Sequence, residues 1–336
     1  MATPNFAFGG GIFMAPEFKS SEDVQEYLSV LEEHGIKIID TSAIYGKSEQ
    51  FLGEAKAASR FTIDTKAPGA MSPEPSTKDV VVAAGKNSLE KLRTSQVDVY
   101  YIHVPDTRLP FAETLEGIDA LYKSGAFRRF GLSNFSPEQT NEVLRICRER
   151  GFVLPTVYQG NYNAVGRLAE SQLFPILREN NIAFYAYSPI AGGFLAKTTE
   201  GIKEGKGRWD PSSFLGKLSQ GLYGSRPAML GALDTWNKIA ASEGIPASEM
   251  AFRWVFHNSI LDGSKGDAVI VGASSPEQLR KTVAAVRKGP LSSAVQGQIQ
   301  EMWEGMKHEA FLDNISGQSE ELMKELGDMI KQSKQS

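Results

Sequence analysis

Short apolar segments that favour β-strands recur along the chain, and each is followed by a stretch of helical character. Eight of these segments are expected to form strands: residues 6–10, 36–40, 61–66, 97–103, 129–133, 153–159, 182–187 and 268–272. Alternating strands and helices are typical of a parallel sheet whose strands are joined by crossover helices. The pattern of hydrophobic and polar positions therefore predicts an α/β fold.

Helix start signals follow several of the predicted strands. Serine, threonine and acidic residues at 20–23 and 76–79 can cap a first helical turn, and Ser-Pro-Glu occurs at both 136–138 and 275–277. Between Asp40 and Tyr187 the predicted strand ends recur about every 29 residues, the length of one strand–helix unit. Eight such units predict a (β/α)8 TIM barrel of about 250 residues.

The regular spacing fails after the seventh predicted strand. Residues 188–231 are rich in glycine, lysine and aromatic side chains and are too long for a simple connection, so we expect an inserted lid or cofactor loop. Its aromatic residues either pack the loop onto the barrel or line a pocket: Trp209, Phe214 and Tyr223. Residues 1–312 are then expected to form one barrel domain. Residues 313–336 form a polar C-terminal tail, either a short helical extension or solvated chain.

An open, doubly wound sheet would show the same alternation of strands and helices. That fold usually carries a Gly-x-Gly-x-x-Gly turn after its first strand. The glycines at 9–11 do not continue in that way, and no Gly-x-x-x-x-Gly-Lys-Ser/Thr phosphate loop occurs. The closed barrel is therefore favoured.

The composition excludes several classes of protein. Hydrophobic residues make up 41% of the 336 residues, charged residues 23% and aromatic residues 10%, as in ordinary globular proteins and unlike disordered chains, collagen or coiled coils. The 36 basic and 40 acidic residues give a formal charge of −4. This balance offers no basic surface for a polyanion, so nucleic acid is not an expected partner.

Cysteine and histidine are too few for a disulfide framework or a zinc site. The single cysteine, Cys147, lies in a helical stretch and is expected to be a packed side chain, and the four histidines show no zinc-ligand spacing. The chain starts without a basic leader, and no apolar run approaches the roughly 18 residues of a membrane helix. We therefore expect a cytoplasmic protein without a metal site or a membrane partner.

Polar residues close several predicted strands, and in a barrel such strand ends converge on one face. The second strand ends with Asp40 and runs into Tyr45, the third ends with Lys66, and the fourth ends with His103. These four side chains are expected to meet at one mouth of the barrel. Together they suit the delivery of a proton to an oxygen atom that becomes negative.

A free tyrosine, with a pKa near 10, is too weak an acid to donate readily at pH 7. Lys66 at about 4 Å, opposed by Asp40, is expected to lower the pKa of Tyr45 by about one to three units. Asp40 would keep Lys66 charged, and a neutral His103 would orient the substrate oxygen. None of these groups is a strong nucleophile, so a reduction at this site needs a cofactor that carries a hydride.

The sequence Asp-Thr-Ser-x-x-Tyr-Gly at 40–46, with Lys66 and His103 at strand ends, resembles the aldo-keto reductases. The resemblance covers about residues 5–290. Further matching motifs follow in order: Gly-Leu-Ser-Asn-Phe at 131–135, Tyr-Gln-Gly at 158–160, Tyr-Ser-Pro at 187–189 and Gly-Ala-Ser-Ser at 272–275.

Four segments resemble the aflatoxin aldehyde reductase branch of this family: Pro-Thr-Val-Tyr-Gln-Gly-Asn-Tyr-Asn at 155–163, Leu-Phe-Pro at 173–175, Ala-Gly-Gly at 191–193 and Gly-Asp-Ala-Val-Ile-Val-Gly at 266–272. Tyr187-Ser188 stands where that branch often has Phe-Asn. The resemblance implies NADPH-dependent reduction of an aldehyde, ketone or dicarbonyl by a homodimer. It makes Tyr45 the general acid, Asp40 and Lys66 its tuning pair, and His103 the orienting group.

The resemblance also implies where NADPH would bind. The nicotinamide end would lie on Asp40, Ser133, Asn134, Gln159 and Tyr187, with Tyr187 stacked on the ring. The pyrophosphate would lie along Ser188, Pro189, Ile190, Gly192 and Gly193. The adenosine end would lie on Gly272, Ser274, Ser275, Gln278 and Arg280, with Arg208 from the insertion. Ala273 and Gln278 stand where many family members have Lys and Arg, so a preference for NADPH over NADH would rest on the other residues.

Two alternative functions fit the same residues. A redox-sensing module that resembles the potassium-channel β-subunits would bind the cofactor tightly and regulate a partner. A barrel lyase would use Lys66 to form a Schiff base. The loops around the barrel mouth determine which carbonyl compound is bound, and their sequences do not identify it.

Overall fold

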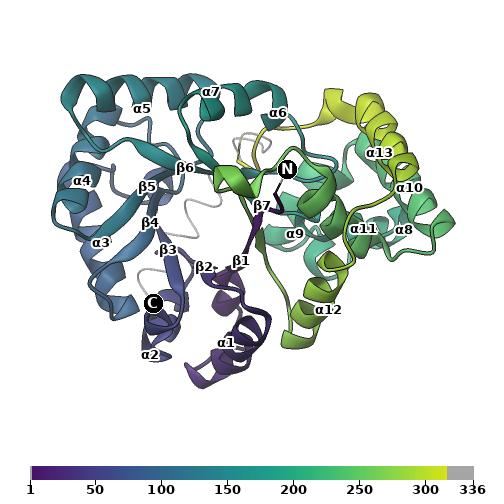
Figure 1. Cartoon of the computed structure of the whole chain (residues 1–336), viewed down its shortest axis with the longest axis horizontal. Coiled ribbons are helices and arrows are strands. Elements are labelled where there is room, and N and C mark those ends of the chain that lie inside the picture. The colour runs from purple at the N-terminus through teal and green to yellow at the C-terminus, as the bar shows by residue number, and fades with distance from the viewer. Residues whose placement is uncertain (1, 316–336) are drawn as a thin grey trace.

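Short buried segments form the strands of a closed barrel in the computed structural model, which describes residues 2–315. All strand pairs are parallel; each strand pairs with the next, and β1 pairs with β8 (Figure 1). The strands are β1 (Asn5–Gly9), β2 (Ile38–Asp40), β3 (Thr62–Ala67), β4 (Val97–Ile102), β5 (Phe127–Ser133), β6 (Pro155–Asn161), β7 (Ala183–Tyr187) and β8 (Ala268–Val271). The predicted (β/α)8 barrel is confirmed, and no predicted strand end is displaced by more than two residues.

Helices surround the barrel (Figure 1). They are α1 (Glu22–His34), α2 (Ser48–Glu54), α3 (Lys78–Leu92), α4 (Phe111–Lys123), α5 (Pro137–Arg150), α6 (Ala169–Gln172), α7 (Phe174–Glu179), α8 (Thr199–Lys203), α9 (Phe214–Ser219), α10 (Pro227–Ser242), α11 (Ala247–Arg253), α12 (Pro276–Val286) and α13 (Ser293–Met306). Three predicted start signals cap helices through side chains, at Thr77, Ser136 and Ser275. The predicted signal at residues 20–23 is not a side-chain cap of the first helical turn. Instead, the carboxylate of Asp23 accepts hydrogen bonds from the backbone N–H groups of Lys19 and Ser20.

The apolar core has two parts. One lies between the strands and the helices, and the other fills the barrel interior with side chains such as Val99, Tyr101 and Tyr185. Gly131 is required by this interior packing, because a Cβ atom there would lie 2.2 Å from Cδ1 of Tyr101. Cys147 is buried in the outer core, as predicted.

The insertion after β7 is built from short helices rather than open loop. It contains α8, α9 and several single helical turns, and the predicted boundary at residue 231 falls inside α10. Trp209 and Tyr223 are buried against Phe194, whose ring centroid lies 4.9 Å from that of Tyr223. These aromatic side chains therefore pack the insertion against itself, and Tyr223 also contacts Phe311, which follows α13.

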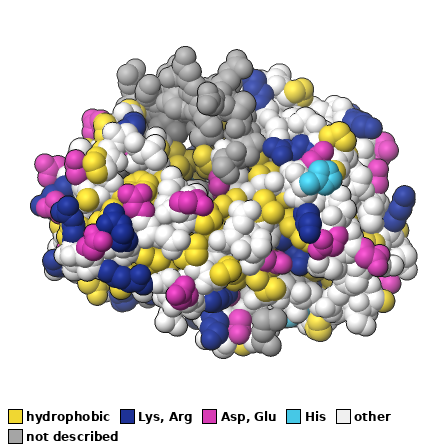
Figure 2. Space-filling view, turned by 90° about the horizontal axis from the view of Figure 1, so that it is seen from above, with side chains coloured by type: hydrophobic (Ala, Val, Ile, Leu, Met, Phe, Trp, Pro, Cys, Tyr) yellow, Lys and Arg dark blue, Asp and Glu magenta, His cyan; other side chains and the backbone are white. Residues whose placement is uncertain are grey.

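No helix among residues 2–315 is long and apolar enough to cross a membrane. Basic and acidic side chains are intermixed on the face shown in Figure 2, without a broad area of one sign. The predicted tail begins within the described chain at residue 313, but residues 316–336 lie outside it.

Candidate active site

Asp40 and Lys66 form a buried ion pair at the carboxyl ends of β2 and β3. The ammonium Nζ lies 2.7 and 2.6 Å from the two carboxylate oxygens of Asp40 and 2.8 Å from the carbonyl oxygen of Thr41. The amide of Gln159 donates to the same carboxylate at 2.8 Å. Each of the three ammonium donors therefore has an acceptor, and Lys66 is held as a fixed cation.

Burial on its own would lower the pKa of Lys66, but the adjacent Asp40 carboxylate outweighs it and the pKa is raised. A lysine that forms a Schiff base must become a neutral amine first. The three acceptors and the raised pKa both oppose that step. The geometry therefore disfavours the lyase alternative.

Tyr45 lies beside this cation in the turn that follows β2. Its ring centroid is 5.4 Å from Nζ of Lys66 and 5.7 Å from the ring centroid of His103, with the two rings nearly perpendicular at 80°. Its hydroxyl makes no hydrogen bond to another described residue. The structure thus brings together the four side chains that the strand-end pattern predicted, and leaves the phenol available to a ligand.

The pKa of Tyr45 differs from the expectation. Burial raises it, Lys66 lowers it, Asp40 raises it, and the net shift is upward. The prediction of a lowered pKa is therefore wrong, because it counted the two charges but not the loss of solvent around the phenol. Lys66 still makes the phenol more acidic than it would be in the same place without a cation.

His103 is neutral and held through its Nδ1 atom. Burial and the nearby charge of Lys66 lower its pKa well below the usual value. Nδ1 lies 3.0 Å from Oγ of Ser42, and Nε2 has no hydrogen-bond partner among residues 2–315. Ser42 was not among the predicted site residues, since its contact joins positions 61 residues apart and leaves no local signal.

Ser133 is the last residue of β5 and pairs in register with Gln159, two residues before the end of β6. Ser133 Oγ accepts from Asn134, so its own proton remains free, while the carbonyl oxygen of Gln159 has no partner among the described residues. One free donor beside one free acceptor matches the two needs of a carboxamide.

Asn134 is more fully engaged than expected. Its amide donates to the carbonyl oxygen of His103 at 2.9 Å and to Ser133, and its carbonyl oxygen accepts from the Tyr187 hydroxyl at 2.7 Å. Its left-handed backbone, with φ of 61°, is uncommon for a residue other than glycine. Asn134 therefore links the Tyr187 hydroxyl to the backbone of His103, just after the end of β4.

Asn314 also contacts this region, and sequence analysis did not single it out. Its backbone N–H donates to the hydroxyl of Tyr187 at 3.3 Å, and its side chain lies 3.5 Å from Oγ of Ser188. The first residues of the predicted tail therefore pack against the predicted cofactor-binding residues. A separation of 127 residues explains why no sequence pattern signalled the contact.

The chain after β7 exposes backbone at two glycines. Gly192 and Gly193 have φ values of 65° and 100°, and a Cβ atom at Gly193 would meet nothing within 4 Å. A Cβ atom at Gly192 would lie 3.7 Å from the guanidinium of Arg208. Open backbone next to a cation suits a phosphate group. Pro189 and Ile190, predicted for the same role, are buried and half-buried in this turn.

The predicted adenosine end lies at the start of α12. Gly272 borders open space, and Ser274 donates to the Gln278 side chain from both its backbone N–H, at 2.6 Å, and its hydroxyl, at 2.9 Å. Ser275 caps the helix. Arg280 instead pairs with Glu26 and Glu33 of α1, at 3.7 and 3.5 Å. The Arg280 guanidinium is therefore paired with α1 in this structure, whereas Arg208 lies beside Gly192.

A second buried polar group lies in the barrel and was not predicted. Arg129 pairs with Asp98 at 2.6 Å and donates to the Tyr185 hydroxyl at 3.0 Å. Asp64 accepts from the backbone of Val99, but its other oxygen is buried without a partner among the described residues. Burial, Asp98 and Asp40 raise the pKa of Asp64 well above its usual value.

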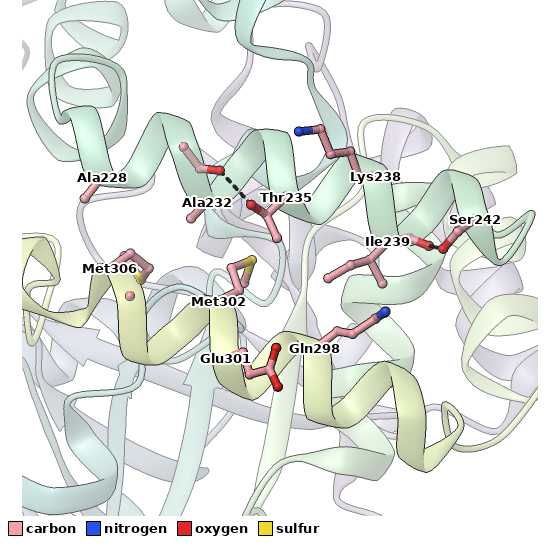
Figure 3. A pocket seen from close by; sticks show the side chains of 12 residues that line it. Ala228, Ala232, Thr235, Lys238, Ile239, Ser242, Gln298, Glu301, Met302 and Met306 are labelled. Carbon is pink, nitrogen blue, oxygen red and sulfur yellow. Dashed lines mark hydrogen bonds between the residues drawn. The ribbon is translucent and has the colours of Figure 1, made fainter.

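A groove of about 710 Å³ lies between α10 and α13 (Figure 3), and none of the residues described above lines it. The hydroxyls of Thr235 and Ser242 that border it donate to carbonyl oxygens of their own helix. It carries two charged residues, Lys238 and Glu301. No metal-binding group of three or more His, Cys, Asp or Glu occurs in the part of the chain that the structure describes. The strand-end cluster is therefore the candidate active site.

Comparisons with known proteins agree with this geometry. The Aldo/keto reductase family model matches residues 6–304. Oxidoreductase sirO of Leptosphaeria maculans is 36% identical over 317 residues, which cover 91% of this chain and 96% of that protein. Aflatoxin B1 aldehyde reductase member 2 of Homo sapiens is 37% identical over 291 residues, which cover 82% of this chain and 80% of that protein. The resemblance inferred from the motifs is confirmed.

Proposed function

The chain belongs to the aldo/keto reductase family, and from that premise we propose that it reduces aldehydes and dicarbonyls to alcohols with NADPH, with Tyr45 as the proton donor. The observation that supports this most strongly is the buried Asp40–Lys66 pair, which places a fixed cation 5.4 Å from the Tyr45 ring, next to a neutral His103. A fixed cation and a neutral hydrogen-bonding ring suit an oxygen that gains negative charge.

Proton transfer from Tyr45 remains favourable despite its raised pKa. An alkoxide formed from a carbonyl is the conjugate base of an alcohol, whose pKa lies near that of water and far above that of a free phenol. Lys66 keeps the Tyr45 phenol more acidic than burial alone would, and because its pKa is raised the phenol stays protonated at neutral pH and can donate. Lys66 then stabilises the phenolate that remains after the proton has left.

The free donor of Ser133 and the free acceptor of Gln159 fit the carboxamide of a nicotinamide. Tyr187, fixed through Asn134 and Asn314, offers a ring on which the nicotinamide can rest. When bound, the reduced nicotinamide would supply the hydride. The open backbone at Gly192 and Gly193 suits the pyrophosphate.

NADPH rather than NADH is proposed from the resemblance to the aflatoxin aldehyde reductase branch, and Arg208 is one candidate cation for the 2′-phosphate. The start of α12 contributes the hydroxyl groups of Ser274 and Ser275, and Arg280, whose side chain is 43% exposed, is proposed as a second cation for that phosphate. We also propose a homodimer in the cytoplasm, where the buried, unpaired Cys147 would stay reduced. Light scattering on the purified protein, whose chain mass is 36.7 kDa, distinguishes a monomer from a dimer.

The test is a titration of the purified protein with NADPH and with NADH, followed by quenching of tryptophan fluorescence. Aldehydes and dicarbonyls, succinic semialdehyde among them, are then added while the absorbance of the reduced nicotinamide is recorded. Tighter binding of NADPH with turnover of a carbonyl compound supports the proposal. Tight binding without turnover over the panel favours the redox-sensing alternative, and no binding of either nucleotide refutes both.

A further inference from the structure

We infer that Ser42 is a positioning residue that holds His103 in a single neutral tautomer, with Nδ1 as hydrogen-bond acceptor and the ring proton on Nε2. The tautomer follows from the described contacts alone. Its consequence for catalysis, a donor directed to the carbonyl oxygen of the substrate, rests on the proposed function.

The contact is short and shielded from water. Oγ of Ser42 lies 3.0 Å from Nδ1 of His103, and Ser42 is only 1% exposed. The backbone N–H of Ile44 points to the same Oγ atom at 3.4 Å. Oγ of Ser42 therefore accepts one hydrogen bond from the backbone of its own turn and also contacts Nδ1 of His103.

The number of donors and acceptors selects the tautomer. A serine hydroxyl has one proton to donate and two lone pairs to accept with. Nδ1 of His103 is the one acceptor that Oγ of Ser42 contacts among residues 2–315. If Nδ1 carried the proton, Oγ would receive two donors and its own proton would be buried without an acceptor, which is costly. If Nδ1 is unprotonated, each group is satisfied.

The doubly protonated ring is disfavoured as well. Burial and the positive charge of Lys66 keep the pKa of His103 well below its usual value, so the ring is neutral at pH 7. With Nδ1 unprotonated, the single ring proton must be on Nε2, which has no hydrogen-bond partner among the described residues. A donor is thus left free for a ligand.

The same turn also fixes the proton donor. The backbone N–H of Tyr45 donates to the carbonyl oxygen of Ser42 at 3.0 Å, and the Tyr45 ring contacts the ring of His103 edge to face. One short turn therefore sets the position of the phenol and the tautomer of the histidine. Alanine at position 42 would keep the backbone contact and remove only the hydroxyl.

The direct test is a long-range ¹⁵N–¹H correlation spectrum of the full-length protein labelled in its histidine rings. With four histidines in the chain the spectrum is simple, and substitution of His103 assigns its signals. His257 serves as an internal reference, because its Nε2 lies 2.7 Å from the carbonyl oxygen of Val286 and must carry a proton. We expect His103 to show the same Nε2–H pattern. A proton on Nδ1, or a charged ring at pH 7, overturns the inference.

The variant Ser42→Ala tests the cause. We expect its His103 signals to move towards a mixture of the two neutral tautomers, while Ser48→Ala leaves them unchanged. Ser48 is a matched control, since it is fully buried in the same region but bonds to Gly10 and Thr41. An unaltered His103 pattern in Ser42→Ala overturns the role of the serine. The spectrum of the unsubstituted protein decides the tautomer even if this variant does not fold.

A double-mutant cycle tests the catalytic consequence. Ser42→Ala should lower kcat/KM for a carbonyl substrate about tenfold, with NADPH affinity unchanged, and should have no further effect in a His103→Gln background. Equal losses in both backgrounds would show that Ser42 does not act through His103. If no carbonyl compound is turned over, the proposed function fails while the NMR result on the tautomer stands by itself.

Discussion

Replacing Lys66 with methionine removes the cation from the site and keeps a side chain of similar length. Asp40 would then be a buried carboxylate, 3% exposed, that keeps only the Gln159 amide as a side-chain donor. Removing one partner of a buried pair costs about 3–5 kcal/mol of unfolding free energy. We expect a loss of that size in urea unfolding at pH 7.

The matched control is Lys78→Met. Lys78 forms an ion pair of similar length, 2.7 Å, with Glu116, but the two side chains are 49% and 47% exposed. Exposed ion pairs contribute little to stability because water and salt screen them, so this variant should be nearly as stable as the wild type. The double variant Asp40→Leu/Lys66→Met should recover much of the loss, because it leaves no unpaired buried charge.

The same substitution changes the acidity of Tyr45. At 5.4 Å and an effective dielectric constant of about 20, a unit charge contributes about 3 kcal/mol, or about two pKa units. Without Lys66 the unbalanced Asp40 raises the pKa of Tyr45 further. We expect kcat to fall about 10- to 100-fold at temperatures where the variant is folded, with NADPH affinity nearly unchanged. Lys66→Met with wild-type stability and wild-type kcat would refute this reasoning.

Three further predictions concern the stability of the barrel, and each is measured by urea unfolding. Asp64→Asn keeps the acceptor for the Val99 backbone and removes a carboxyl group whose pKa is raised in the folded state. Above pH 3.8 the unfolded wild type releases a proton that the folded protein retains, and this difference destabilises the wild type. The variant should therefore be about 1–2 kcal/mol more stable than the wild type at pH 7, and by less at pH 4. An equal difference at both pH values would contradict the pKa shift. The pKa of His103 is lowered in the folded state, so below pH 6.5 the unfolded chain binds a proton that the folded protein does not. The wild type should therefore lose up to about 1.4 kcal/mol of unfolding free energy per pH unit from this group as the pH falls. For His103→Gln, the unfolding free energy should depend less on pH. Gly131→Ala should cost about 1–3 kcal/mol because the new methyl group meets the Tyr101 ring; wild-type stability would show that the ring moves freely.

The strands could be predicted because parallel strands in a barrel are buried on both faces and therefore appear as short apolar runs. The last residues of those runs also predicted the site, since strand ends converge whatever the loops do. Asp40, Lys66 and His103 were located in this way, and Tyr45 followed from its place just after a strand end.

Other features depend on distances that the sequence does not contain. The direction of the Tyr45 pKa shift is set by packing around the phenol, and Ser42 and Asn314 reach their partners across 61 and 127 residues. The helices of the insertion were missed because α8 and α9, of five and six residues, are too short to show a helical period. The assignment of Arg280 to the cofactor stays a prediction, and its ion pairs with α1 could not be predicted because they depend on how two helices pack.

The most direct measurement compares Tyr45→Phe with the wild-type protein, in NADPH binding and in single-turnover reduction of an aldehyde that the wild type accepts. Phenylalanine keeps the ring contacts with Lys66 and His103 and removes only the hydroxyl. We predict an unchanged dissociation constant for NADPH and a fall in the reduction rate of about 100-fold or more. A variant that reduces the aldehyde at nearly the wild-type rate would contradict the assignment of Tyr45 as the proton donor.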